Sequence, residues 1–222
     1  MKKQPVYTSE PLNKEKFTKD FDSFYSRFAV IYGMAVKLFP FWKTWVKRAL
    51  PYIIGPRVLE VSFGTGYLLT QYADKFDTYG IDYNQEMVSI TKKQLLKKGI
   101  TAKIQEGNVG SLPYESDFFD SIVNTMAFTG YPDGMKAMSE LFRVLKKGGR
   151  VILIDIGYPR DRNQIGMMMT RFWALAGDII RDMDKIFKSF NFDYKDVEIG
   201  GYGSVHLFIA EKRAHGSLLN GS

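Results

Sequence analysis

Arg57-Val58-Leu59-Glu60-Val61-Ser62-Phe63-Gly64-Thr65-Gly66 is the most informative stretch of this chain, an apolar run that ends in a glycine-rich turn. It predicts a strand over residues 57–62 and a helix over 66–75. The next apolar run predicts a strand over 78–82 that ends at Asp82, 18 residues after Gly64. Glycines let a ligand approach the backbone, a helix N-terminus offers free N–H groups, and a carboxylate after the second strand can accept hydrogen bonds from both ribose hydroxyls. The sequence therefore predicts an α/β sheet that holds a nucleoside-containing cofactor.

The alternation of strands and helices continues along the rest of the chain, which favours a parallel sheet. Further helices are expected over 84–98, 132–145 and, in one or two pieces, 162–190; further strands are expected over 101–106, 120–124, 150–156, 194–199 and 204–211. The last two strands flank Gly200-Gly201-Tyr202-Gly203 and predict an antiparallel β-hairpin. The predicted fold is a Rossmann-like, seven-stranded, mostly parallel sheet with helices on both faces.

Composition bounds the chemistry of the chain. Its 222 residues, 45% hydrophobic and 25% charged, suit one globular α/β domain. The absence of cysteine excludes disulfides, thiolate metal sites and cysteine catalysis. The two histidines, His206 and His215, are too few for a histidine metal cluster, and no metal is expected. Because residues 1–20 are polar and lysine-rich and no apolar run reaches about 20 residues, a cytoplasmic protein is expected.

The positive charge is concentrated near the N-terminus. Residues 1–50 contain ten Lys or Arg and four Asp or Glu, a net charge of +6 out of +7 for the whole chain. The expected organisation is a flexible basic arm over 1–20, an N-terminal helical lid over 21–54, a cofactor-binding domain over 55–213 and a disordered tail over 214–222.

Several motifs together resemble class I S-adenosylmethionine (SAM) dependent methyltransferases. Glu60-x-x-x-Gly64-x-Gly66 is similar to the signature in which an acid precedes the glycine loop. The segment 106–114, which ends in Leu112-Pro113-Tyr114, resembles the family's Gly-Asp-Ala-x-x-Leu-Pro-Phe loop. The string 140–150 resembles the helix and turn before the fifth strand of the UbiE-like, methyltransferase type 11 group. The resemblance covers roughly residues 20–156 and implies that SAM is the cofactor and S-adenosylhomocysteine the product.

The resemblance implies a set of cofactor-binding residues. Glu60 would receive the ammonium of the methionine part, Asp82 the ribose hydroxyls, and Met87 the adenine face. Two positions depart from the family pattern, because Ser62 replaces a glycine and Asn108 replaces an acid that accepts a hydrogen bond from the adenine amino group. Asp82 also suits a helix cap, and Met87 suits ordinary core. The implied residues are Glu60, Ser62, Gly64, Thr65, Gly66, Asp82, Tyr83, Met87, Asn108, Val109 and Asn124.

The acceptor side is less defined. The segment 25–32 resembles the family's Tyr-Asp-x-x-Ala-x-x-Tyr-Asp lid element, with both acids replaced, by Ser26 and Gly33. Methyl transfer from a sulfonium needs alignment more than acid–base help, so a missing base does not argue against catalysis. His206 suits either a base or a structural role. The candidates on the acceptor side are Tyr25, Tyr32, Phe128, Tyr131, Tyr158, Arg160, Trp173 and His206.

The leading hypothesis is a methyltransferase that acts on a small or lipophilic molecule, quinone- or lipid-like, by in-line SN2 transfer. A SAM-binding regulator without activity is the main alternative. A nicotinamide-dependent oxidoreductase is disfavoured because the third glycine of its motif would fall at Leu69. Lysines and aromatic residues over 37–48 suit either an anionic membrane surface or the solvated face of a lid. No motif indicates nucleic-acid binding, and the oligomeric state is left open.

Overall fold

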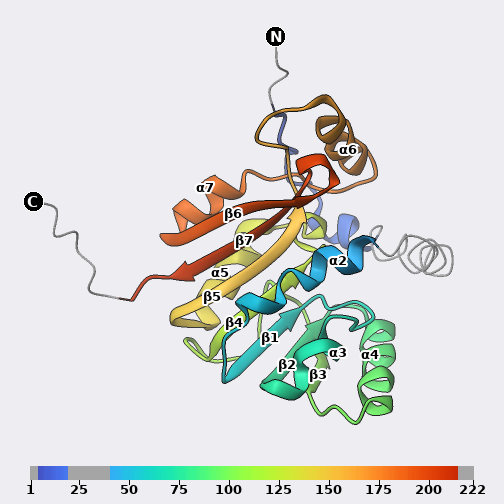
Figure 1. Ribbon diagram of the computed structural model, residues 1–222, viewed down its shortest axis with the longest axis vertical. Coiled ribbons are helices and arrows are strands. Elements are labelled where there is room, and N and C mark those ends of the chain that lie inside the picture. Colours follow the sequence, from blue (N-terminus) through green and yellow to red (C-terminus); the bar gives the residue numbers. More distant parts are fainter. Residues whose placement is uncertain (1–4, 20–40, 215–222) are drawn as a thin grey trace, which may run out of the picture.

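The computed structural model describes residues 5–19 and 41–214, and it contains one seven-stranded sheet in the order β3-β2-β1-β4-β5-β7-β6 (Figure 1). The strands are β1 (Arg57–Val61), β2 (Asp77–Asp82), β3 (Lys103–Glu106), β4 (Phe119–Thr125), β5 (Leu145–Ile156), β6 (Phe192–Gly200) and β7 (Val205–Lys212). Strand β7 runs antiparallel to both of its neighbours, and the other pairs are parallel. The predicted Rossmann-like fold with its antiparallel C-terminal hairpin is confirmed.

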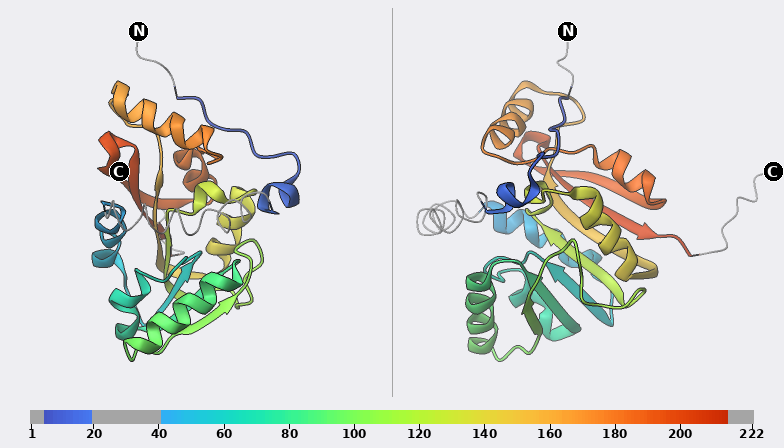
Figure 2. Two further views of the ribbon diagram at one scale, coloured as in Figure 1. Left: turned by 90° about the vertical axis from the view of Figure 1, so that its right-hand side faces the viewer. Right: turned by 180° about the vertical axis from the view of Figure 1, so that it is seen from behind.

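Helices cover both faces of this sheet (Figure 2). They are α2 (Phe41–Lys47), α3 (Leu69–Tyr72), α4 (Gln85–Lys97), α5 (Gly134–Val144), α6 (Gln164–Leu175) and α7 (Met183–Ser189). Side chains of α5 and α7 belong to one buried cluster, and those of α3 and α4 belong to the cluster on the other face. In α5, Ala137, Met138, Leu141 and Val144 are buried at helical spacing, which explains why this segment is a helix and which face it turns to the sheet.

Two elements differ from the sequence-based expectation, whereas the long helical region, expected in one or two pieces, is divided into α6 and α7. The helix expected over 66–75 is shorter, with α3 followed by the 3-10 turn η2 (Ala73–Lys75). The turn expected at Lys147-Gly148-Gly149 lies inside β5, because Leu145 already pairs with Phe119 across a register shift. Gly148 accommodates the irregularity with φ of 74°.

Strand register places the candidate site. Val61 at the end of β1 aligns with Ile81 of β2 and with Asn124 of β4. The carboxyl ends of these three parallel strands therefore meet at one edge of the sheet. In open α/β sheets this edge, where the strand order reverses, is where ligands bind.

Residues 5–19 lie against the domain at this edge. The Thr8 amide donates to the Ile180 carbonyl at 2.9 Å, and the Ile180 amide donates to Thr8 Oγ1 at 3.2 Å. Lys14 forms an ion pair with Asp133 at 2.6 Å. The described part of the segment expected to be a flexible basic arm thus makes hydrogen bonds with the domain. Most of the expected lid and tail, residues 20–40 and 215–222, lies outside the described residues.

Candidate functional site

The loop after β1 carries three residues in the left-handed region. Their φ angles are 52° for Ser62, 55° for Gly64 and 72° for Gly66. The conformation of Ser62 explains why a glycine is usual at this position. A Cβ on Gly66 would lie 2.4 Å from Thr91 Cγ2, whereas a Cβ on Gly64 would meet nothing within 4 Å. Gly66 is therefore required by packing, and Gly64 faces open space where a ligand can approach the backbone.

Asp82 ties the first two loops of the edge together. Its carboxylate accepts hydrogen bonds from the Gly64 amide at 2.8 Å and from the Asn84 amide at 2.9 Å. Asn84, not Asp82, caps α4, because its Oδ1 accepts from the amides of Glu86 and Met87. Asp82 is thus placed by the turn between β2 and α4 and lies directly beside the glycine loop.

Glu60 is a buried carboxyl group in the middle of this region. It is 1% exposed, and the Tyr72 hydroxyl donates to its Oε2 at 2.8 Å. Burial raises the pKa of Glu60 to about 8, and the negative charge of Asp82 adds to the effect. At neutral pH the group therefore carries a proton for most of the time. A cationic ligand group beside it would favour the ionised form.

The loop after β3 lies beside the end of β2. The Gly107 amide donates to the Asp82 carbonyl at 2.9 Å, which fixes the start of this loop. Asn108 is exposed, and its Oδ1 accepts from the Gly110 amide at 2.8 Å, so this side chain stabilises a turn. The remaining residues implied by the resemblance lie around the same loops: Val109 and Met87 are half-buried, and Thr65 and Tyr83 are exposed.

Tyr131 links the ends of β1 and β4. Its hydroxyl lies 2.8 Å from Ser62 Oγ and accepts a hydrogen bond from Asn124 Nδ2 at 2.6 Å. Burial raises the pKa of Tyr131, so the phenol is neutral. Asn124 Oδ1 is buried and has no hydrogen-bond partner within the described part of the chain. Tyr131, a candidate for the methyl-acceptor side, is thus in contact with Ser62 and Asn124, two candidates for cofactor binding. The Asn124 oxygen remains able to accept a hydrogen bond from a ligand.

Arg181 holds the turn that carries Tyr131. Its guanidinium donates to the carbonyl of Phe128 at 2.9 Å and to the carbonyl of Tyr131, and its Nε lies 3.5 Å from Glu10 Oε1. Glu10 Oε1 also accepts from the Gly134 amide at 3.0 Å. Sequence reasoning did not find Arg181 or Glu10, because neither belongs to a local motif and their contacts span most of the chain.

A second group that the sequence did not indicate is a pair of acids, the buried Asp155 and the half-buried Asp178. Thr129 Oγ1 lies 3.0 Å from Asp155 Oδ1 and 2.7 Å from Asp178 Oδ1. Burial raises the pKa of Asp155 to about 6, and it also raises the pKa of Asp178. Because the Thr129 hydroxyl has one proton, it can donate to only one of these two carboxyl groups at a time.

The other acceptor-side candidates lie apart from this arrangement. His206 is buried on β7, with Nδ1 2.8 Å from Asp196 Oδ1 and Nε2 3.2 Å from the Tyr158 carbonyl oxygen. Both ring nitrogens are therefore engaged within the protein, as a structural histidine requires. Arg160 forms an ion pair with Asp196 at 3.1 Å, and Trp173 packs against the cluster that contains α3. Tyr25 and Tyr32 lie outside the described residues.

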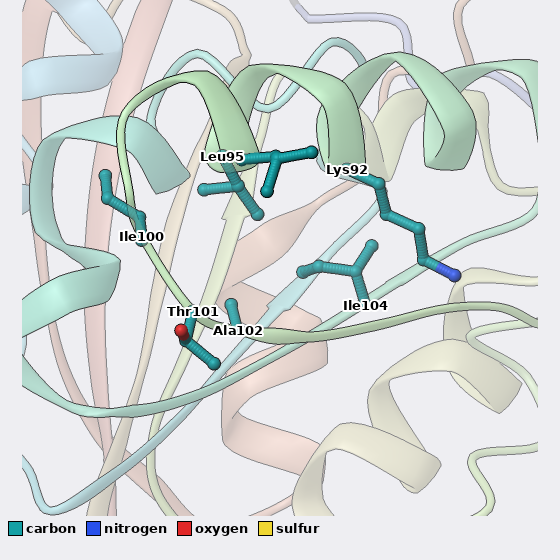
Figure 3. A pocket seen from close by; sticks show the side chains of 7 residues that line it. Lys92, Leu95, Ile100, Thr101, Ala102 and Ile104 are labelled. Atoms are coloured by element: carbon teal, nitrogen blue, oxygen red, sulfur yellow. The ribbon is translucent and has the colours of Figure 1, made fainter.

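A hollow of about 330 Å³ lies elsewhere, between α4 and β3 (Figure 3). Its walls are mainly apolar and include Leu95, Ile100 and Ile104, with Lys92 at the rim. It lies at the β3 side of the sheet and contains none of the residues that the motifs single out. We therefore place the candidate site at the carboxyl ends of β1, β2 and β4.

Residues 59–153 match the family model described as "Methyltransferase domain", the type 11 group. The fold and the loops at this edge agree with a SAM-dependent methyltransferase. The cofactor of the class is SAM. In the described residues, no helix is long and apolar enough to cross a membrane.

Individual proteins agree with this assignment. The chain is 29% identical over 125 residues to the ubiquinone/menaquinone biosynthesis C-methyltransferase UbiE of Geotalea daltonii, covering 54% of this chain and 53% of that one. It is 28% identical over 113 residues to a phosphatidylethanolamine N-methyltransferase of Cereibacter sphaeroides, covering 50% and 55%. The chain thus spans about half the length of these two relatives. The crystal structure of YcgJ from Bacillus subtilis aligns with a TM-score of 0.63 at 20% identity, covering 78% of this chain and 98% of that one.

Proposed function

We propose that this protein transfers the methyl group of SAM to a small or lipophilic acceptor, quinone- or lipid-like, by in-line SN2 displacement. The observation that carries the proposal is the Asp82 carboxylate bonded to the Gly64 amide, beside a loop whose Gly64 faces open space. Of the two relatives above, one is named as a C-methyltransferase of ubiquinone/menaquinone biosynthesis and the other as an N-methyltransferase of phosphatidylethanolamine. Their names support a lipophilic acceptor for this chain.

The residues of the edge suit the parts of SAM. Asp82 would accept hydrogen bonds from the ribose hydroxyls. Glu60 would face the ammonium group and lose its proton when that positive charge is bound, because the charge lowers its pKa. Asn124 Oδ1, buried without a partner among the residues described, offers one further acceptor. Since Asn108 Oδ1 is engaged with Gly110, we expect the adenine ring to be recognised by the Val109 amide and by packing on Met87.

The protein's part in the reaction is alignment. Bound SAM supplies a methyl group on a positively charged sulfur. An acceptor atom held in line with the sulfur–carbon bond would take the methyl group, the electron pair of that bond would stay on sulfur, and an acceptor that carries a proton would release it to solvent after the transfer. Phe128 and Tyr131, whose rings meet edge to face at 5.5 Å, would form the apolar wall that excludes bulk water from the acceptor.

Calorimetry of SAM and S-adenosylhomocysteine binding tests the cofactor site, with Asp82→Ala as the variant and Asp77→Ala as its control. Asp77 lies at the opposite end of β2, where it pairs with Lys103 at 2.8 Å. Hydrogen bonds to charged groups contribute about 1.5–3 kcal/mol each, so Asp82→Ala should weaken binding at least tenfold. Asp77→Ala should leave it unchanged. Equal affinities in both variants, with thermal unfolding showing that both are folded, would refute the site.

Turnover tests the reaction itself. Formation of S-adenosylhomocysteine is measured with quinone extracts and with phospholipid extracts as acceptors. Product formed with either extract, and lost in Asp82→Ala, would support methyl transfer. Tight SAM binding without product in either extract would instead support the alternative, a SAM-binding regulator.

A further inference from the structure

Helix α6 turns an apolar face to solvent. Ile165, Met168, Phe172 and Leu175 are 48%, 66%, 64% and 88% exposed. Their spacing of three, four and three residues places them along one side of the helix. Figures 1 and 2 show α6 at one end of the molecule, beyond the edge of the sheet. A helix on the surface of a globular protein ordinarily shows its polar side to water, so this face calls for a partner.

The inner side of α6 is hydrogen-bonded to and packed against the rest of the domain. Thr170 Oγ1 donates to the Gly157 carbonyl, and Asn163 Nδ2 donates to the Tyr202 carbonyl at 2.9 Å. A Cβ on Gly166 would lie 2.3 Å from the carbonyl oxygen of Tyr202, which shows how closely the inner side of α6 approaches its neighbours. The apolar outer side therefore does not result from a helix that has failed to dock.

The charges around α6 identify the kind of partner. The segment 162–177 contains two arginines, Arg162 and Arg171, and no acidic residue. The acids that flank it are hydrogen-bonded within the protein: Asp161 accepts from the Asn163 amide at 2.9 Å, Asp178 contacts Thr129, and Glu198 accepts from the Arg160 amide at 2.6 Å. An apolar stripe with cationic side chains and no anionic ones is typical of a helix that lies in the interface of an anionic lipid surface.

Other surfaces suit this role less well. In α2, Trp42 and Trp45 are packed against the domain: the Trp42 ring contacts the Tyr67 ring at 5.2 Å, and Trp45 lies against Gly200. A second copy of the chain is also a weaker choice, because a stable dimer buries about 800 Å² on each partner. The outward stripe of one twelve-residue helix is small by comparison.

We propose that α6 is an interfacial helix that binds an anionic lipid surface through Ile165, Met168, Phe172 and Leu175, with Arg171 at the edge of the contact. The residues that follow α6 lead directly to the candidate site, since the Ile179 amide donates to the Thr129 carbonyl at 2.8 Å. A lipid surface on α6 would therefore lie close to the turn that carries Tyr131. From there a lipid-soluble acceptor would reach the candidate site. This delivery of the acceptor rests on the proposed function, whereas the lipid contact of α6 does not.

Vesicle co-sedimentation of the full chain tests the contact. Vesicles of phosphatidylcholine alone are compared with vesicles that contain about a third phosphatidylglycerol. The variant is Phe172→Ser with Leu175→Ser, and the control is Leu96→Ser, because Leu96 is 80% exposed on the lysine-rich helix α4. We expect binding to the anionic vesicles that falls at least tenfold in the α6 variant and is unchanged in Leu96→Ser. Arg171→Gln should weaken it about fivefold, in a salt-dependent manner.

Three results would overturn the proposal: no binding of the wild-type chain, equal binding of the α6 variant, or equal loss in Leu96→Ser. Sedimentation equilibrium without lipid provides a fourth, because a dimer that dissociates in the α6 variant would assign the face to a second copy. Thermal unfolding and SAM affinity of the α6 variant should match those of the wild type. Failure of the lipid contact is thereby distinguishable from failure of the cofactor site.

Discussion

Arg181→Met is the substitution that tests most directly how the candidate site is held together. The Arg181 side chain is 7% exposed and donates to the carbonyls of Phe128 and Tyr131, so methionine would fill the space but leave both carbonyls without their donor. The turn between them would lose the contact that presents the Tyr131 hydroxyl to Ser62 and Asn124.

The magnitude follows from these contacts. Two hydrogen bonds from a charged donor contribute about 1.5–3 kcal/mol each. Burial of the charged guanidinium has a desolvation penalty, which is also why burial lowers the pKa of Arg181. Removal of the guanidinium abolishes this penalty and so offsets part of the free energy lost with the two hydrogen bonds. We expect a net loss of about 3 kcal/mol in the free energy of unfolding. For a chain of this length that corresponds to a fall in Tm of about 6–12 °C.

Equilibrium unfolding in urea, followed by circular dichroism, measures the change. Glu10→Gln is the matched control, because glutamine keeps an oxygen for the Gly134 amide and removes only a partly exposed ion pair at 3.5 Å, which is worth under about 1 kcal/mol. The reasoning is refuted if Arg181→Met unfolds within about 1 kcal/mol of the wild type. It is also refuted if Glu10→Gln costs as much as Arg181→Met.

Three further predictions follow from burial and backbone geometry. Because the pKa of Glu60 is raised from 4.5 to about 8 in the folded state, the free energy of unfolding should fall as pH rises between these values. Urea unfolding measured at several pH values should show a smaller fall in Glu60→Gln than in the wild type. Gly66→Ala should destabilise more than Gly64→Ala by thermal unfolding, since only Gly66 meets Thr91, whereas Gly64→Ala should weaken SAM binding in calorimetry. Leu141→Ala, at a fully buried position of α5, should cost about 3 kcal/mol in urea unfolding; a loss under about 1 kcal/mol would contradict the packing described.

The fold could be predicted from the sequence because its signals are local. Strands β1 and β5 contain short apolar runs, and β2 ends where the sequence places the polar group of Asp82. The interval of 18 residues between Gly64 and Asp82 predicted that Asp82 ends the next strand, and one strand–helix–strand unit returns the chain to the same edge, where the Gly64 amide donates to Asp82 at 2.8 Å.

The rest of the site depends on contacts that no local pattern encodes. Glu10 and Arg181 meet across most of the chain, and each lies in a segment without a recognisable motif. The same holds for residues 5–19, whose polar composition is typical of a mobile arm although Thr8 exchanges two hydrogen bonds with Ile180. Composition indicates the local conformational preference of a segment. It contains no information on which distant residues the segment contacts.

The two departures from the family pattern have local explanations in the structure. Ser62 adopts the left-handed conformation that a glycine would adopt more readily, at a cost of about 1–2 kcal/mol, and its hydroxyl is 2.8 Å from the Tyr131 hydroxyl. Asn108 uses its side-chain oxygen to hold the Gly110 amide. The Ser62 side chain therefore makes a hydrogen bond that glycine at this position could not make, and the Asn108 side chain makes one that holds its turn. A binding site that had lost its ligand would have no need of a strained residue at the end of β1. The Ser62–Tyr131 contact therefore favours a loop whose conformation is retained for SAM binding. The calorimetric comparison of Asp82→Ala with the wild type tests this.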